Sequence, residues 1–165
     1  MAGIKPGCGQ QLLLHLARHA GQPIAVHKRS ILVVEDSDED FATVQDAARR
    51  AGLTQTVVRA TSGDACMRLL RGEMRGRTAA PLLVLLDLNT PGDDGREALR
   101  EIRRDPALKT MPLVVLSGSA NPRDLQSCYA SGVNAYHVKP VDHALHLQVL
   151  QQIFTYWLCS VALPG

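Results

Sequence analysis

From Ser30 onward, short apolar runs alternate with segments in which apolar residues recur with the period of a helix. This alternation predicts repeated βα units around a parallel sheet. The runs that are rich in β-branched residues predict five strands, over residues 31–35, 55–60, 82–87, 113–117 and 135–138. The first, third and fourth runs are apolar enough to be covered on both faces of a sheet. The pattern therefore predicts an α/β fold.

Five helices are predicted between and after these strands by their capping residues. Ser37 can cap the first helix, and Asp40 three positions later completes a pattern similar to a capping box. Asn121 followed by Pro122 opens the fourth helix. The five helices are expected to begin near residues 37, 62, 95, 121 and 142, and the last to continue past residue 157. Strict alternation indicates a doubly wound, five-stranded parallel sheet of flavodoxin-like order 2-1-3-4-5, with helices on both faces.

Residues 1–29 differ from the remainder, because glycines and prolines lie on both sides of one short amphipathic piece. We expect an N-terminal extension there, either flexible or one short helix. Residues 30–161 are expected to form one domain with a long C-terminal helix. A chain of 165 residues with 45% apolar residues is consistent with a single core.

Charge and cysteine content narrow the possible functions. The 18 basic and 16 acidic residues form no long single-sign run, which argues against nucleic-acid binding. No apolar run approaches the roughly 18 residues of a membrane span. The four cysteines lack metal-site spacing and are expected to be reduced thiols. We therefore expect a cytoplasmic protein that binds neither membrane nor nucleic acid.

Polar residues follow the apolar runs of four of the five predicted strands. They are Glu35 and Asp36, then Asp87, then Ser117, then Lys139. In an open parallel sheet these strand ends line one crevice, which is where ligands bind. Three crowded carboxylates would repel one another unless they shared a cation, and an all-oxygen set suits Mg²⁺.

A carboxylate at a strand end beside a metal and a lysine is a plausible nucleophile toward phosphorus. Asp87 is the candidate nucleophile, and Lys139 would hold the incoming phosphoryl group. Ser117 could donate its hydroxyl to a phosphoryl oxygen, and Asn89 could offer its backbone carbonyl to the metal. Each residue alone would be an ordinary turn residue, but the complementary groups at four strand ends together favour phosphoryl transfer.

Several motifs resemble the response-regulator receiver domain over roughly residues 30 to 160. They are Ile31-Leu-Val-Val-Glu-Asp-Ser, Leu85-Leu-Asp-Leu-Asn-Thr-Pro, Gly95 and Tyr136-His-Val-Lys-Pro140. The resemblance implies a phosphorylated aspartate at Asp87. It also implies that Mg²⁺ is held directly by Asp36, by Glu35 often through water, by Asp87, and by the main-chain oxygen of Asn89.

The same resemblance assigns the signalling residues. Ser117 matches the hydroxyl switch, Tyr136 the aromatic residue that changes rotamer, and Lys139 the residue that pairs with the phosphoryl group. It implies a cis peptide before Pro140. Phosphorylation would bias a two-state arrangement of the fourth helix and fifth strand. The implied protein is a signalling phosphoacceptor of a two-component phosphorelay rather than an enzyme, with slow self-catalysed phosphotransfer and autodephosphorylation.

A narrower resemblance links the chain to stand-alone regulators that partner bacterial phytochrome histidine kinases. It is carried by Leu86-Asp-Leu-Asn, Asp94-Gly-Arg-Glu-Ala-Leu, Leu108-Lys-Thr-Met-Pro-Leu-Val-Val-Leu and Phe154-Thr-Tyr-Trp-Leu with Leu163-Pro164. It implies a red-light-sensing kinase partner and a homodimer through the fourth helix, fifth strand and fifth helix. The long apolar stripe of the last helix also favours a dimer. The alternative is that this helix folds back on its own domain. The stripe is made of Leu145, Val149, Leu150, Ile153, Phe154, Trp157, Leu158 and Val161.

Other interpretations remain open. The protein could serve a chemotaxis or general phosphorelay kinase. An aspartyl-phosphate phosphohydrolase of the haloacid-dehalogenase type is a remote alternative, because it needs a second aspartate where this chain has Asn89. A non-phosphorylated docking module usually lacks parts of the acid, lysine and hydroxyl set. The histidine pairs His15 and His19, and His143 and His146, are interpreted as surface residues.

Overall fold

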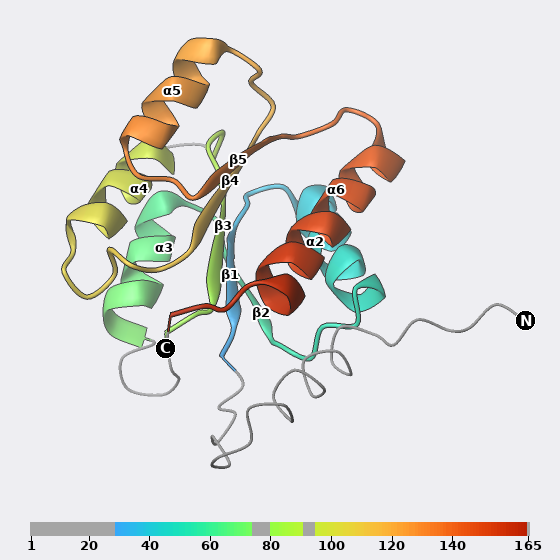
Figure 1. Ribbon diagram of the computed structural model, residues 1–165, viewed down its shortest axis with the longest axis horizontal. Helices are drawn as coiled ribbons and strands as arrows, with labels where there is room; N and C mark the ends of the chain where they lie inside the picture. Colours follow the sequence, from blue (N-terminus) through green and yellow to red (C-terminus); the bar gives the residue numbers. More distant parts are fainter. Residues whose placement is uncertain (1–28, 74–79, 91–94, 165) are drawn as a thin grey trace, which may run out of the picture.

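The computed structural model describes residues 29–73, 80–90 and 95–164. Five strands form one parallel sheet in the order β2-β1-β3-β4-β5 (Figure 1). The strands are β1 Ile31–Val34, β2 Val57–Ala60, β3 Leu83–Asp87, β4 Leu113–Ser117 and β5 Ala135–Val138. The predicted fold class and strand order are confirmed. The differences are confined to strand ends: β1 stops one residue early, β2 starts two residues late and β3 starts one residue late.

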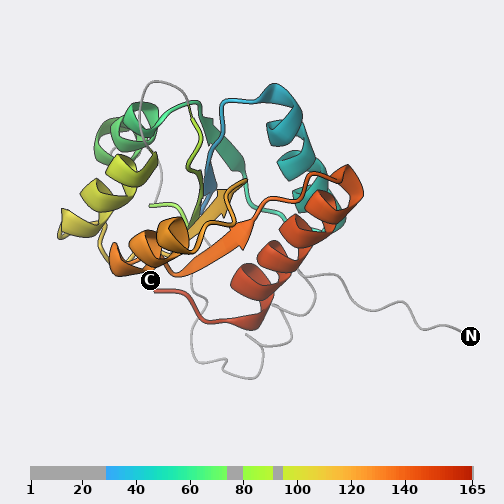
Figure 2. The ribbon, with the colours of Figure 1, turned by 90° about the horizontal axis from the view of Figure 1, so that it is seen from above.

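Helices cover both faces of the sheet (Figures 1 and 2), with α2 and α6 on one face and α3, α4 and α5 on the other. They are α2 Asp38–Arg50, α3 Gly63–Arg68, α4 Gly95–Arg104, α5 Pro122–Ala130 and α6 His143–Thr155. Two π-helical turns, η1 Leu69–Glu73 and η2 Tyr156–Ser160, extend α3 and α6. Each predicted helix is present.

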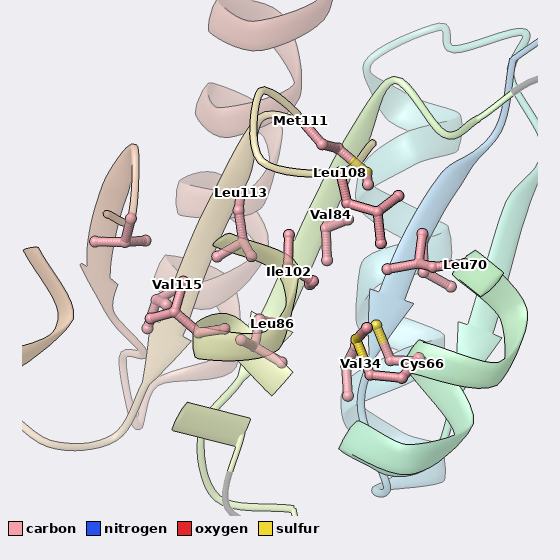
Figure 3. Close-up of a cluster of buried hydrophobic side chains, with 14 of the residues drawn as sticks. Val34, Cys66, Leu70, Val84, Leu86, Ile102, Leu108, Met111, Leu113 and Val115 are labelled. Carbon is pink, nitrogen blue, oxygen red and sulfur yellow. The ribbon is translucent and has the colours of Figure 1, made fainter. Parts of the chain in front are cut away.

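The core follows from the two-residue period of the strands. In β3, Val84 and Leu86 pack toward α3 and α4 (Figure 3), whereas Leu83 and Leu85 pack toward α2 and α6. All four side chains are fully buried. Burial of each such side chain contributes roughly 1.5–3 kcal/mol. The central strand is therefore rigid up to its last residue, Asp87.

Helix ends are fixed largely as predicted. Ser37 caps α2 by accepting the backbone N–H of Asp40 at 3.2 Å, and Asn121 caps α5 by accepting that of Arg123 at 2.9 Å. Gly52 follows α2 with a φ of 71°, a conformation that suits glycine. The capping box is only half formed, because the N–H of Ser37 donates to Glu35 instead of Asp40.

Gly95 opens α4 at the point where this helix approaches the end of β3. A Cβ atom there would lie 2.8 Å from the carbonyl oxygen of Asp87 and 3.0 Å from the Cα of Leu88. Both neighbours are backbone atoms, so any larger residue would push α4 away from the strand end. Glycine thus lets α4 pack directly against the Asp87 backbone.

The last helix packs mainly on its own domain, which was the stated alternative to a dimer contact for its apolar stripe. Leu145 alone among the stripe residues is exposed, with 54% of its surface accessible. The reason is geometric, because α6 lies beside α2 on one face of the sheet (Figure 2). The stripe residues that are buried or half-buried against the domain are Val149, Leu150, Ile153, Phe154, Trp157 and Leu158.

Two further expectations are corrected. His146 was expected at the surface, but it is only 4% exposed because it lies on the sheet-facing side of α6. The Lys139–Pro140 peptide is trans, as no described residue has a cis bond. A peptide bond before proline ordinarily favours the trans form over the cis form by about 0.5–1 kcal/mol.

The cysteines were expected to be reduced thiols, and the structure agrees only in part. Cys66 and Cys128 are buried, reduced thiols, as expected, whereas Cys159 is disulfide-bonded, contrary to expectation. A disulfide depends on how close two sulfurs come in space, and sequence spacing does not reveal that.

Among the described helices, none has the length and apolar character needed to cross a membrane. The predicted extension over residues 1–29, with His15 and His19, lies outside the described residues except for Arg29.

Candidate functional site

The carboxyl ends of β1, β3 and β5 meet at one edge of the sheet around the ammonium group of Lys139. Its Nζ lies 2.9 Å from Glu35 Oε2 and 2.8 Å from Asp87 Oδ2. A third carboxylate comes from the first turn of α2, where Asp40 Oδ2 lies 2.7 Å from the same nitrogen. Three acids and one lysine from three separate segments of the chain thus form one site.

Asp87 is buried and held through both of its carboxylate oxygens. Only 5% of the residue is exposed. Its Oδ1 accepts the backbone N–H of Asn89 at 2.9 Å, while Oδ2 accepts from Lys139. The side chain therefore stands in a fixed orientation at the end of a rigid strand, as a nucleophile requires.

Glu35 is similarly fixed, with 3% of its surface exposed. Its Oε1 accepts the backbone N–H of Ser37 at 3.0 Å, and its Oε2 accepts from Lys139. Burial raises the pKa of this carboxyl above its ordinary value, although the bonds to Lys139 and Ser37 oppose the rise. The bonds to Lys139 and Ser37 therefore offset the effect of burial on Glu35 only in part.

The charge balance of the site favours a cation. A lysine ammonium has three N–H donors, and here each faces one carboxylate. Burial opposes the charged form of Lys139, but the three carboxylates raise its pKa. Three negative charges against one positive charge leave an excess of negative charge.

The donor set also fits a divalent metal. Glu35, Asp40 and Asp87 each offer an oxygen, and the offered atoms lie within 4.8 Å of one another. Hard divalent ions prefer all-oxygen sites of this kind. A divalent cation is therefore expected beside the Lys139 ammonium that these carboxylates already bind, as the strand-end carboxylates predicted.

Two predicted metal ligands lie at the rim. Asp36 is exposed, and the acidic cluster among the described residues contains Asp40 in its place. The backbone oxygen of Asp36 accepts from Arg59 Nη2 at 2.7 Å, which orients this part of the loop toward β2. Asn89 is exposed as well, next to Asp87. The roles of Asp36 and Asn89 as metal ligands stay predictions.

Ser117 and Tyr136, the predicted switch residues, converge on Ser119. The Ser117 hydroxyl is buried at the end of β4 and accepts the backbone N–H of Ser119 at 3.1 Å. Tyr136 is half-buried, and its hydroxyl donates to the Ser119 carbonyl at 2.8 Å. The loop after β4 thus connects the strand end to the aromatic ring of β5.

Arg59 of β2 and Asp40 were not predicted as site residues. Arg59 Nε donates to the backbone oxygen of Glu35 at 2.8 Å, and its guanidinium lies 4.9 Å from the ring centre of Phe41. It thereby fixes the loop that carries Glu35 and Asp36. An arginine inside an otherwise apolar strand was the available signal. Asp40 gave a weaker signal, because it looked like part of a helix cap.

A model of the response regulator receiver domain matches residues 31–153 of the chain. The match covers most of the chain and includes the strand ends described above. The protein belongs to the response regulator receiver family.

Within this family the chain is similar to regulators named for phytochromes. It is 38% identical over 137 residues to the response regulator Rcp1 of Synechocystis sp., which covers 82% of this chain and 92% of that protein. The structure of the phosphorylated cyanobacterial phytochrome response regulator RcpA matches with a TM-score of 0.78 and 38% identity, covering 83% of this chain and 99% of that one. The Mn²⁺-bound form of Rcp1 matches with a TM-score of 0.77 and 37% identity over the same shares.

Proposed function

We propose that this protein accepts a phosphoryl group from a histidine kinase on Asp87, in a reaction that requires Mg²⁺. The observation that carries the proposal is the placement of Asp87, which is buried at a strand end and held by Lys139 and by the backbone of Asn89. The surrounding carboxylates and the ammonium supply the charges that phosphoryl transfer needs.

The proposed step is an in-line displacement at phosphorus. A carboxylate oxygen of Asp87 forms a bond to phosphorus, and the phosphorus–nitrogen bond to the kinase histidine breaks, returning the electron pair to the imidazole. Glu35, Asp36, Asp87 and the carbonyl of Asn89 would hold Mg²⁺, which neutralises charge on the phosphoryl oxygens. Lys139 pairs with one of those oxygens, and Ser117 donates its hydroxyl to another.

The proposed output is a change of shape rather than turnover of a substrate. When Ser117 turns toward the phosphoryl group, the N–H of Ser119 loses its acceptor, and Tyr136 loses a fixed partner on the same loop. Such a rearrangement would bias the positions of α5 and β5. Water attack on the acyl phosphate at the same site would end the signal.

We propose a bacterial phytochrome kinase as the partner. The similarity to Rcp1 and to RcpA, a phytochrome response regulator by name, supports this choice. The experiment is transfer of labelled phosphate to this protein from an autophosphorylated phytochrome kinase, held in each of its two light states. We expect transfer to wild-type protein that depends on the light state and on Mg²⁺.

A chemotaxis kinase or a general phosphorelay kinase is the matched comparison. Faster transfer from either of these kinases than from the phytochrome kinase would contradict the proposal that a phytochrome kinase is the partner. No transfer from any kinase would contradict the phosphorelay function itself.

We further propose a homodimer through the face formed by α5, β5 and α6. Apolar side chains exposed on this face supply the surface for a contact, and such patches mark interaction sites. They are Leu125, Tyr129, Val138, Val141 and Leu145. The similarity to the phytochrome regulators, and not the buried stripe of α6, supports this assignment.

The dimer is tested by the variant Leu145→Asp. We expect it to sediment as a monomer under conditions in which wild-type protein is dimeric, because the change buries a charge in the contact. Thr54→Asp, in the exposed loop between α2 and β2, is the control and should leave the dimer intact. A dimer of unchanged affinity in Leu145→Asp would exclude this face.

A further inference from the structure

We propose that Asp40 is a positioning residue that anchors the Lys139 ammonium in the non-phosphorylated protein, and thereby limits how tightly the site accepts a phosphoryl group. The inference rests on the proposed function of Asp87. It concerns a residue outside the set that the strand ends predict.

The contact between Asp40 and Lys139 is the shortest of the three ion pairs at the site. Oδ2 of Asp40 lies 2.7 Å from Nζ, against 2.8 Å for Asp87 and 2.9 Å for Glu35. The Asp40 side chain is 34% exposed, whereas those of Glu35 and Asp87 are 4% and 7% exposed. If Lys139 leaves one of its three partners, that carboxylate is left without a counter-charge. The cost is smallest for Asp40, because water can reach its carboxylate.

The Asp40 carboxylate is not used to cap its helix. In a complete capping box it would accept the backbone N–H of Ser37. That N–H donates to Glu35 Oε1 instead, at 3.0 Å. The backbone N–H of Asp40 completes the cap with the Ser37 hydroxyl, and its carboxylate is left to hold Lys139.

The anchor acts against the phosphoryl group in two ways. All three N–H donors of Lys139 face carboxylates, so a phosphoryl oxygen must displace one of them. Asp40 also places a negative charge beside the position that the phosphoryl group would occupy, and like charges at this separation repel appreciably. Loss of the Asp40 charge should therefore favour the phosphorylated arrangement, whereas loss of a merely structural contact should weaken it.

The test is a titration of the full chain with beryllofluoride in saturating Mg²⁺, followed by fluorine NMR of the bound fluorides. We expect Asp40→Asn to lower the concentration at half-saturation about fivefold. Asp40→Ser should shift it in the same direction, and Asp40→Glu should return it toward the wild-type value. Glu39→Gln is the matched control, because it removes an equal charge from the exposed side of the same helix turn.

A second measurement detects the ion pair between Asp40 and Lys139 directly, in the absence of metal and of beryllofluoride. In wild-type protein the Lys139 ammonium should give a slowly exchanging nitrogen NMR signal, identified by its absence in Lys139→Arg. The signal should be lost in Asp40→Asn and kept in Glu39→Gln.

The outcomes separate the two claims. Unchanged or weaker beryllofluoride binding in Asp40→Asn, or an equal shift in Glu39→Gln, would overturn the role of Asp40. Binding that survives in Asp87→Asn would instead overturn the proposed phosphoacceptor.

Discussion

Replacement of Lys139 by methionine is expected to lower the free energy of unfolding by about 3 kcal/mol at neutral pH without divalent metal. The ammonium is the counter-charge of Glu35, Asp40 and Asp87, which offer oxygens within 4.8 Å of one another. Without it, two nearly buried carboxylates would stand unpaired. The unbranched methionine side chain fills the space of the lysine methylene groups. The decrease in the free energy of unfolding should therefore come from the lost charge and not from lost packing.

The loss should depend on pH in a direction fixed by Glu35. Burial raises the pKa of Glu35 above its ordinary value of 4.5, although Lys139 opposes that rise. A carboxyl group whose pKa is raised by folding adds stability below its unfolded pKa and loses it as pH rises through the folded pKa. Without Lys139 the pKa of Glu35 should rise further. The deficit of Lys139→Met should therefore be largest near neutral pH and shrink as the pH falls far enough for Glu35 to bind its proton.

Urea unfolding of both proteins in EDTA, at neutral and at acidic pH, measures this effect. Lys109→Met, at an exposed position, is the matched control and should change stability by less than about 0.5 kcal/mol. A deficit of equal size at both pH values would contradict the electrostatic explanation.

The fold was predictable because its determinants are local. Apolar runs of four or five residues, helix caps such as Ser37 and Asn121, and the glycine after α2 all act within a few positions of the chain. Strand ends were less certain, because pairing with a neighbour decides the last residue. Glu35 follows an apolar run, yet β1 ends at Val34.

The site was predictable where a polar residue ends a buried strand. Asp87 met this condition, while Glu35 and Lys139 directly follow β1 and β5. The place of Asp40 could not be derived in this way, because it depends on how close the first turn of α2 comes to Lys139 in space. Asp36 is exposed, and its backbone oxygen accepts from Arg59 on another strand, a contact that sequence spacing does not reveal.

The last helix held a signal that was interpreted wrongly. His146 precedes Leu150 by four positions and Ile153 by seven, which is the spacing of one helix face. That face is buried against the sheet and against α2. Periodicity could thus have placed His146 inside, but it could not tell whether the partner of the stripe was this domain or a second copy.

The second large effect is a complete loss of phosphorylation when Asp87 becomes asparagine. The amide keeps the shape of the side chain and can still accept from Asn89, but it is a poor nucleophile. Asp36, Asp40 and Glu35 remain as carboxylates. The variant therefore tests whether another nearby carboxylate can accept the phosphoryl group in place of Asp87. Among the described residues, Asp87 is the acid that ends β3, and both of its oxygens are held there.

The most direct test is the intact mass of the full chain after incubation with Mg²⁺ and acetyl phosphate. Wild-type protein should gain one acid-labile phosphoryl group, and none when EDTA replaces Mg²⁺. Asp87→Asn should gain none in either condition, while Asp64→Asn, an exposed acid on α3, should behave as wild type. An acid-labile phosphoryl group on Asp87→Asn would contradict the assignment of Asp87 as the phosphoacceptor.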